Sequence, residues 1–112
     1  MTKIQDLTKD QLKKIIDGLK DHGIGINTYG IHDDFLYLHR DLESHGQVFM
    51  IDSIHIYNCG SDYLAYYSSH DVVGNDWRDI KMKDAGSTIL GAALHLFQRV
   101  NNYRINELYG ME

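Results

Sequence analysis

Residues 35–57 have the sequence FLYLHRDLESHGQVFMIDSIHIY, in which apolar and polar side chains alternate on both sides of a short polar break. A period of two is typical of β-strands that bury one of their faces. The break, residues 43–46, is polar and ends in glycine, which predicts a turn. We therefore predict a hairpin of two antiparallel strands, over residues 35–42 and 47–57.

The alternation of apolar and polar side chains changes phase within the second of these strands. Phe49 and Ile51 share one parity, whereas Ile54 and Ile56 share the other. A β-bulge inserts an extra residue and thereby reverses the side on which the following side chains point. A bulge at residues 52–53 would return all four apolar side chains to the core face, and we predict one there.

A helix is predicted before the hairpin. Thr8 is a favourable N-cap residue, and Gln11 three residues later completes a capping box. Apolar side chains then recur at helical spacing until Gly23, which supplies a left-handed C-cap. These residues have a structural explanation, so no function is assigned to this helix.

The remaining segments add strands and a second helix. Residues 24–30 and 63–69 alternate like strands, whereas residues 70–84 are predicted to form a loop. Apolar residues at helical spacing predict a helix over 85–100, which the paired asparagines after it are expected to end. Residues 1–112 are thus expected to form a single α+β domain: an N-terminal helix, a three- to four-stranded antiparallel sheet, and a C-terminal helix packed on one sheet face.

The composition is that of an ordinary globular protein. Hydrophobic residues make up 43% of the chain, which is enough for one packed core, and no apolar run is long enough to span a membrane. The polar N-terminus differs from a secretory signal, and the single cysteine, Cys59, cannot form an internal disulfide. A cytoplasmic location and no membrane partner are therefore predicted.

Negative charge is concentrated in the predicted sheet. Residues 31–80 hold nine acidic residues and two arginines, a net of −7, whereas the whole chain has a net charge of −5. A surface field of one sign attracts partners of the opposite sign and repels nucleic acid. The acidic residues are Asp33, Asp34, Asp41, Glu43, Asp52, Asp62, Asp71, Asp76 and Asp79.

Histidines gather in the same stretch, which holds five of the seven in the chain. Imidazole and carboxylate together suit zinc and other divalent metals, and the best local cluster is His32, Asp33, Asp34, His39 and Asp41. Because its spacing is poor, no metal and no cofactor is assigned, and a metal-binding protein or small metal-dependent hydrolase is the alternative hypothesis. Neighbouring carboxylates are expected to favour the protonated imidazoles.

Two segments resemble catalytic motifs, but neither has all the residues that its motif requires. His39-Arg40-Asp41 matches the catalytic tripeptide of protein kinases, but Gly46 stands where that motif requires asparagine. Cys59 lies in a predicted turn without the context of an activated thiolate. We therefore predict that the protein is not an enzyme.

Aromatic residues point to binding instead. Strand alternation predicts that Tyr37, Tyr57, Tyr63 and Tyr67 lie on or near the sheet face opposite the helices. Exposed sheet aromatics can stack nucleic-acid bases, but such sheets are flanked by basic residues, and this one is acidic. Trp77 is expected to be either a plug folded onto the core or an interface anchor.

The favoured hypothesis is a small non-catalytic protein that presents this acidic face to a basic protein surface, such as that of a nuclease, without binding nucleic acid directly. Small size, acidity and the absence of proline resemble small phage or mobile-element inhibitors, such as anti-CRISPR, anti-restriction and immunity proteins. The small residues at 91–93 predict close packing on the sheet or a homodimer through the C-terminal helix. The predicted partner-binding residues are Tyr37, Asp41, Tyr63, Tyr67, Asp76 and Trp77.

Overall fold

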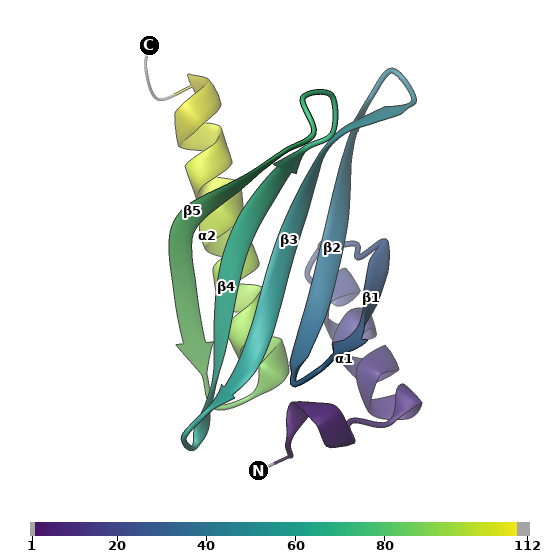
Figure 1. Cartoon of the computed structure of the whole chain (residues 1–112), viewed down its shortest axis with the longest axis vertical. Helices are drawn as coiled ribbons and strands as arrows, with labels where there is room; N and C mark the ends of the chain where they lie inside the picture. The colour runs from purple at the N-terminus through teal and green to yellow at the C-terminus, as the bar shows by residue number, and fades with distance from the viewer. Residues whose placement is uncertain (1, 110–112) are drawn as a thin grey trace.

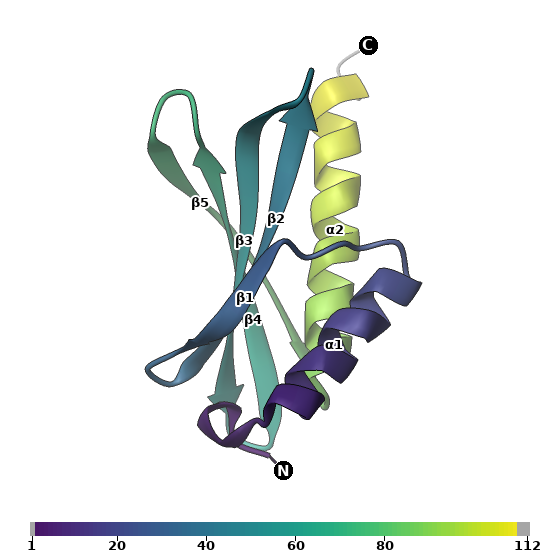
Figure 2. The same cartoon turned by 90° about the vertical axis from the view of Figure 1, so that its right-hand side faces the viewer.

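The computed structural model describes residues 2–109, in which five antiparallel strands form one sheet and both long helices lie on the same side of it (Figures 1 and 2). The strands follow one another in space as they do in sequence, so each pairs with the next. The predicted α+β class, with a helix at each end of the chain, is confirmed. In chain order the elements are η1 (Ile4–Asp6), α1 (Lys9–Asp21), β1 (Thr28–His32), β2 (Phe35–Ser44), β3 (Gln47–Cys59), β4 (Asp62–Asp71), β5 (Asp76–Gly86) and α2 (Ile89–Tyr109).

Helix α1 begins and ends as its sequence predicts. The Thr8 hydroxyl accepts a hydrogen bond from the Gln11 backbone N–H at 3.2 Å, and the Gln11 side chain accepts one from the Thr8 N–H at 2.8 Å. At the other end Gly23 has a φ of +79°, and the Ile24 N–H donates to the Leu19 carbonyl at 2.9 Å. These contacts satisfy backbone groups that a helix end leaves open.

The β2–β3 hairpin is the one predicted from the alternation of residues 35–57. Ser44 pairs with Gln47 across a two-residue turn. Both turn residues, His45 and Gly46, have a positive φ, of 53° and 77°. Positive φ at both central positions defines a type I′ turn, whose twist suits adjacent antiparallel strands. The predicted turn is therefore confirmed.

Strand β5 corrects the expectation of a loop in this region and of three to four strands. It pairs with β4 along its length, but the register shifts between Tyr67 and Ser68. The pairing skips Ile80 and Lys81 of β5, and Lys81 has a left-handed φ of 57°. Two skipped residues leave the side-chain parity unchanged, but the positions of β5 that share the parity of the helix side include Asp76, Arg78 and Asp84. Apolar residues therefore do not alternate with polar ones along the strand, and the sequence pattern does not reveal it.

The register of β3 also corrects the bulge expected in the middle of that strand. Pairing with β4 is continuous there, and the register with β2 shifts instead at Phe49, which the pairs skip. Ile54 and Ile56 are fully buried, as predicted, whereas Ile51 lies on the opposite face. Asp52 shares the face of Ile54 and Ile56 and is also fully buried, because arginines neutralise it there.

Helix α2 is longer than predicted, since it continues through both asparagines to Tyr109. The side-chain oxygen of Asn101 accepts a hydrogen bond from Nη2 of Arg40 on β2, at 2.9 Å. Asparagine has a low intrinsic helix propensity, which is a weak preference that tertiary contacts override. The break expected at the asparagines is therefore wrong.

The core lies between the sheet and the two helices. A Cβ added to Gly86 at the end of β5 would lie 2.7 Å from the backbone nitrogen of Ala92, so the two backbones approach closely. Ala92 and Ala93 are fully buried in this core, as predicted for close packing on the sheet, while the homodimer stays a prediction. Neither helix of the described chain is long and apolar enough to cross a membrane. The largest fully buried apolar side chains are Phe97, Ile4, Leu19, Leu36, Leu38, Ile54, Ile56, Leu96 and Val100.

Candidate functional site

The sheet face turned away from α1 and α2 is uncovered, and we call it the open face (Figure 2). Residues directly opposite each other on neighbouring strands point to the same face. The pairs Tyr37–His55 and His55–Tyr66 thus place three rings side by side across β2, β3 and β4. The side chains of the open face include those of Phe35, Tyr37, His39, Asp41, Glu43, Ile51, Ser53, His55, Tyr57, Asp62, Leu64, Tyr66, Ser68, His70, Trp77, Asp79 and Lys83.

Aromatic and imidazole rings contact each other over this face. Phe35 stacks on His55 with ring centroids 4.6 Å apart, and Tyr57 meets Tyr66 edge to face at 5.8 Å. Near the β4–β5 hairpin the rings of His70 and Trp77 lie 4.3 Å apart and almost parallel. Ring pairs in these geometries are favourable beyond the area they bury, so the rings support one another while remaining accessible.

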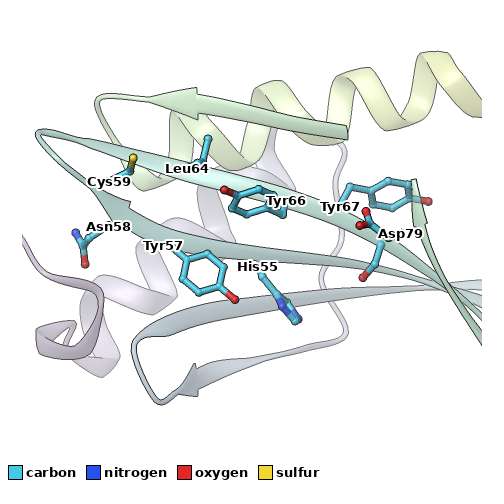
Figure 3. A pocket seen from close by; sticks show the side chains of 9 residues that line it. His55, Tyr57, Asn58, Cys59, Leu64, Tyr66, Tyr67 and Asp79 are labelled. Carbon is cyan, nitrogen blue, oxygen red and sulfur yellow. The ribbon is translucent and has the colours of Figure 1, made fainter. Parts of the chain in front are cut away.

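A groove of about 530 Å³ lies on the open face over β3, β4 and β5 (Figure 3). We call it the β3–β4 groove. Tyr57 and Tyr66 lie in its central part, and Asp79 lies toward one end. The strand register places Ser68 opposite Asp79. The groove therefore offers apolar ring surface together with a carboxylate. Its lining residues are His55, Tyr57, Asn58, Cys59, Leu64, Tyr66, Tyr67, Ser68 and Asp79.

The open face carries more negative than positive charge. Its carboxylates are Asp41, Glu43, Asp62 and Asp79, and the register also places Lys83 there, opposite Tyr66. Glu43, Asp62 and Asp79 are exposed, and Asp41 is partly exposed. The backbone N–H of Lys81 donates to Oδ1 of Asp79 at 2.9 Å, which fixes that carboxylate. A surface with a net negative charge attracts cations and repels anions.

The histidines do not behave as the sequence suggests. Burial lowers the pKa of His39, and the opposing effect of nearby Asp41 does not outweigh it. Burial, followed by the charge of His39, lowers the pKa of His55 as well. The expectation that neighbouring carboxylates favour the charged imidazole is therefore wrong for these two residues, because desolvation disfavours the cation more strongly. Both rings are neutral at pH 7.

Three of the six predicted partner-binding residues, Tyr37, Asp41 and Trp77, lie on the open face. Asp76, opposite Asp71, has the parity of the helix side. Tyr37 and Asp41 project from β2, and the Trp77 side chain is 54% exposed. Trp77 is therefore not a plug over the core, while its role in an interface stays a prediction. Asp76 is exposed at the start of β5, with its carboxylate 3.8 Å from Nε of Arg78.

The other two, Tyr63 and Tyr67, lie on the helix side of the sheet and are only 4% and 2% exposed. The Tyr67 hydroxyl donates to Oδ1 of Asp52 at 2.6 Å, and the Tyr63 hydroxyl donates to the Thr2 carbonyl. Burial, with the hydrogen bond to Asp52, raises the pKa of Tyr67 far above its usual value. Their predicted placement on the open face is wrong. Both faces of β4 carry a tyrosine followed by a serine, Tyr66 and Ser68 on one and Tyr67 and Ser69 on the other, so the residue types do not identify the buried face.

A buried ion cluster accounts for the acidic residue that faces the core. Asp52 accepts hydrogen bonds from Nη2 of Arg40 at 2.7 Å and from Arg104 of α2. A buried carboxylate requires such partners. One signal of the cluster is present in the sequence but was not recognised there: Arg40 and Asp52 share the parity of the core residues in adjacent strands. The cluster joins α2 to the sheet and is structural.

The metal hypothesis gains no geometric support. Among residues 2–105, whose side chains the structure describes, no three histidine, cysteine, aspartate or glutamate side chains are arranged to hold a metal ion. His32 and Asp33 meet at 3.5 Å beside the β1–β2 turn, whereas His39 and Asp41 lie further along β2. Cys59 is exposed at the end of β3. The groove residues that sequence reasoning did not select are His55, Tyr66 and Asp79. His55 and Tyr66 are neighbours across β3 and β4, whereas Asp79 joins the groove only through the pairing of β5 with β4.

Comparisons with protein-family models, curated proteins and solved structures give no significant match to this chain.

Proposed function

We propose that this protein is a non-catalytic binding protein that docks its open face and the adjoining β4–β5 hairpin onto a basic protein surface. The observation that carries the proposal is an uncovered sheet face on which aromatic rings and carboxylates are interspersed. Tyr66 is 42% exposed and Trp77 is 54% exposed, although both are large aromatic residues. Exposed aromatic residues anchor interfaces, and surrounding carboxylates select partners by charge.

The finer proposal is that the basic surface belongs to a nucleic-acid-handling protein, and that this protein inhibits it in the manner of a phage or mobile-element inhibitor. Surfaces that bind phosphates are rich in lysine and arginine. A face that carries Asp41, Glu43 and Asp79 offers negative charges to the same cations, so its partner could not hold nucleic acid at that surface at the same time. The acidic composition of β2 to β5 supports this proposal.

The decisive experiment compares two double variants that remove the same charge from different faces. Asp41→Asn with Asp79→Asn changes the open face, whereas Asp17→Asn with Asp21→Asn changes exposed positions on and at the end of α1. A partner is captured from a bacterial lysate with the wild-type protein, identified, purified and then titrated against each variant by calorimetry at low and moderate salt.

We expect the open-face variant to bind about tenfold more weakly than wild type, and the α1 variant to bind within about twofold of it. Binding should weaken as salt rises, because exposed charges are screened. A partner without a basic surface, or equal losses in both variants, would contradict the proposal. Inhibition is then measured as loss of the partner's nucleic-acid binding when this protein is added.

A further inference from the structure

We propose that the β3–β4 groove is a receptor for an arginine side chain of the partner, with the guanidinium lying against the ring of Tyr66 and paired with the carboxylate of Asp79. This inference rests on the proposed function and names the chemical group that the open face recognises. It also assigns a specific place for that group, in the groove over β3, β4 and β5 rather than anywhere on an acidic surface.

The shape of the groove suits a flat group on a long apolar stem. Tyr57 and Tyr66 meet edge to face, and this arrangement holds their rings in fixed orientations at the centre of the groove (Figure 3). Tyr66 is 42% exposed, so its ring remains available to a ligand. A volume of about 530 Å³ exceeds that of one side chain, which leaves room for the adjoining backbone of the partner.

The charges around the groove favour a cation at one end of it. Oδ1 of Asp79 accepts the Lys81 N–H at 2.9 Å, which orients the carboxylate. In the part of the chain that the structure describes, no side chain pairs with Oδ2 of Asp79, so this atom is available to an incoming donor. His55 also lines the groove, and its lowered pKa keeps it neutral at pH 7, where it does not repel a cation.

Arginine fits this combination better than lysine. A guanidinium is planar, stacks on aromatic faces and presents a fork of donors to a carboxylate, whereas an ammonium is compact and strongly hydrated. The hydroxyl of Ser68, which faces Asp79 across the strand pair, is a further acceptor at the same end. Lys83, opposite Tyr66, is the nearby charge that opposes the ligand.

The test uses two peptides of equal charge, acetyl-Gly-Arg-Gly-Arg-Gly-amide and acetyl-Gly-Lys-Gly-Lys-Gly-amide, titrated into the ¹⁵N-labelled whole protein at pH 7. We expect the arginine peptide to shift the backbone amide signals of Tyr66, Ser68 and Asp79, and to bind about two- to fivefold more tightly than the lysine peptide. Signals of α1 should not move.

Variants at exposed positions sharpen the result without disturbing the core. Asp79→Asn should weaken arginine-peptide binding up to about fivefold, and Lys83→Gln should strengthen it, because the two changes act on charges of opposite sign. Asp17→Asn on α1 removes a charge outside the groove and should leave binding unchanged. The amide spectrum of each variant shows directly whether it has kept the fold.

Equal affinity for the two peptides, signals that shift at the β4–β5 hairpin instead of the groove, or no effect of Asp79→Asn would overturn the arginine receptor. Those outcomes leave the proposed function intact if the captured partner still binds in a salt-dependent way and still distinguishes the two double variants. Loss of that discrimination, by contrast, overturns the proposed function itself.

Discussion

The two faces of the sheet use the same residue types in opposite ways. On the helix side Asp52 is fully buried, and Tyr67 donates a hydrogen bond to it while both contact Arg104. On the open face Asp79 and Tyr66 are exposed and line a groove. Tyr66 and Tyr67 are neighbours in sequence, so their different roles come only from the direction in which the strand points each one.

Pairing with arginine, rather than residue type, separates a structural carboxylate from one that is available to a partner. Asp52 is held by arginines on β2 and α2, and its charge is neutralised inside the protein. Asp79 is oriented by a backbone N–H and keeps its charge at the surface. The negative charge counted from the sequence is therefore larger than the negative charge that the surface presents to a partner.

The largest difference between the two faces should appear when each carboxylate is removed. Asp52→Ala leaves Arg40 and Arg104 without their buried counter-charge, and we expect the free energy of unfolding to fall by about 3–5 kcal/mol. Asp79→Ala should change it by less than about 0.5 kcal/mol, since the site is exposed. Urea unfolding followed by circular dichroism measures both. Similar losses in the two variants would show that the Asp52 cluster does not stabilise the fold.

A smaller effect is expected from one chemical change made at adjacent tyrosines. Tyr67→Phe removes the hydroxyl that bonds buried Asp52 and should cost about 1.5–3 kcal/mol of unfolding free energy. Tyr66→Phe removes a hydroxyl from the open face and should cost less than about 0.5 kcal/mol. The same urea experiment tests the pair, and equal costs would contradict the assignment of faces.

Affinity for the partner, unlike stability, should depend on the open face and not on the helix side of the sheet. Tyr66→Ala removes a proposed anchor, and we expect the captured partner to bind with about 1–2 kcal/mol less free energy. Tyr29→Ala is the matched control, because Tyr29 is also 42% exposed but lies on β1 beside α1. Its affinity for the partner should equal that of wild type in calorimetry. A loss at Tyr29 as large as that at Tyr66 would place the interface elsewhere.

The smallest effect is a pH dependence carried by the open face. Because the folded-state pKa values of His39 and His55 lie below 6.5, the unfolded chain takes up protons first as the pH falls. Their contribution to stability is therefore complete above pH 6.5 and is lost as the pH falls through the folded-state values. Urea unfolding at pH 7.5 and pH 5.5 should show a smaller loss in a His39→Gln, His55→Gln variant than in wild type.

The control for the pH prediction is His95→Gln, at an exposed position on α2. It should lose as much stability as wild type over the same pH interval. If the double variant loses as much as wild type too, the two open-face histidines do not carry the effect.

The sequence by itself determines the elements whose signals lie within a few residues of one another. The caps of α1 join Thr8 to Gln11 and Leu19 to Ile24, and the type I′ turn of the β2–β3 hairpin depends on His45 and Gly46. Local bonds of this kind form wherever the residues occur in the right order. The α+β class follows from the same short-range patterns, as does the acidity of the sheet.

Tertiary structure alone decides the features that depend on partners far along the chain. Arg104 meets Asp52 across 52 residues, and Arg40 meets Asn101 across 61, so neither the burial of Asp52 nor the continuation of α2 is visible locally. The same holds for β5, whose pairing with β4 places Asp79 opposite Ser68 in the groove that Tyr66 also lines. A strand can bury either of its two sets of alternate side chains. Which set is buried depends on the packing contacts and the charge partners that distant elements supply.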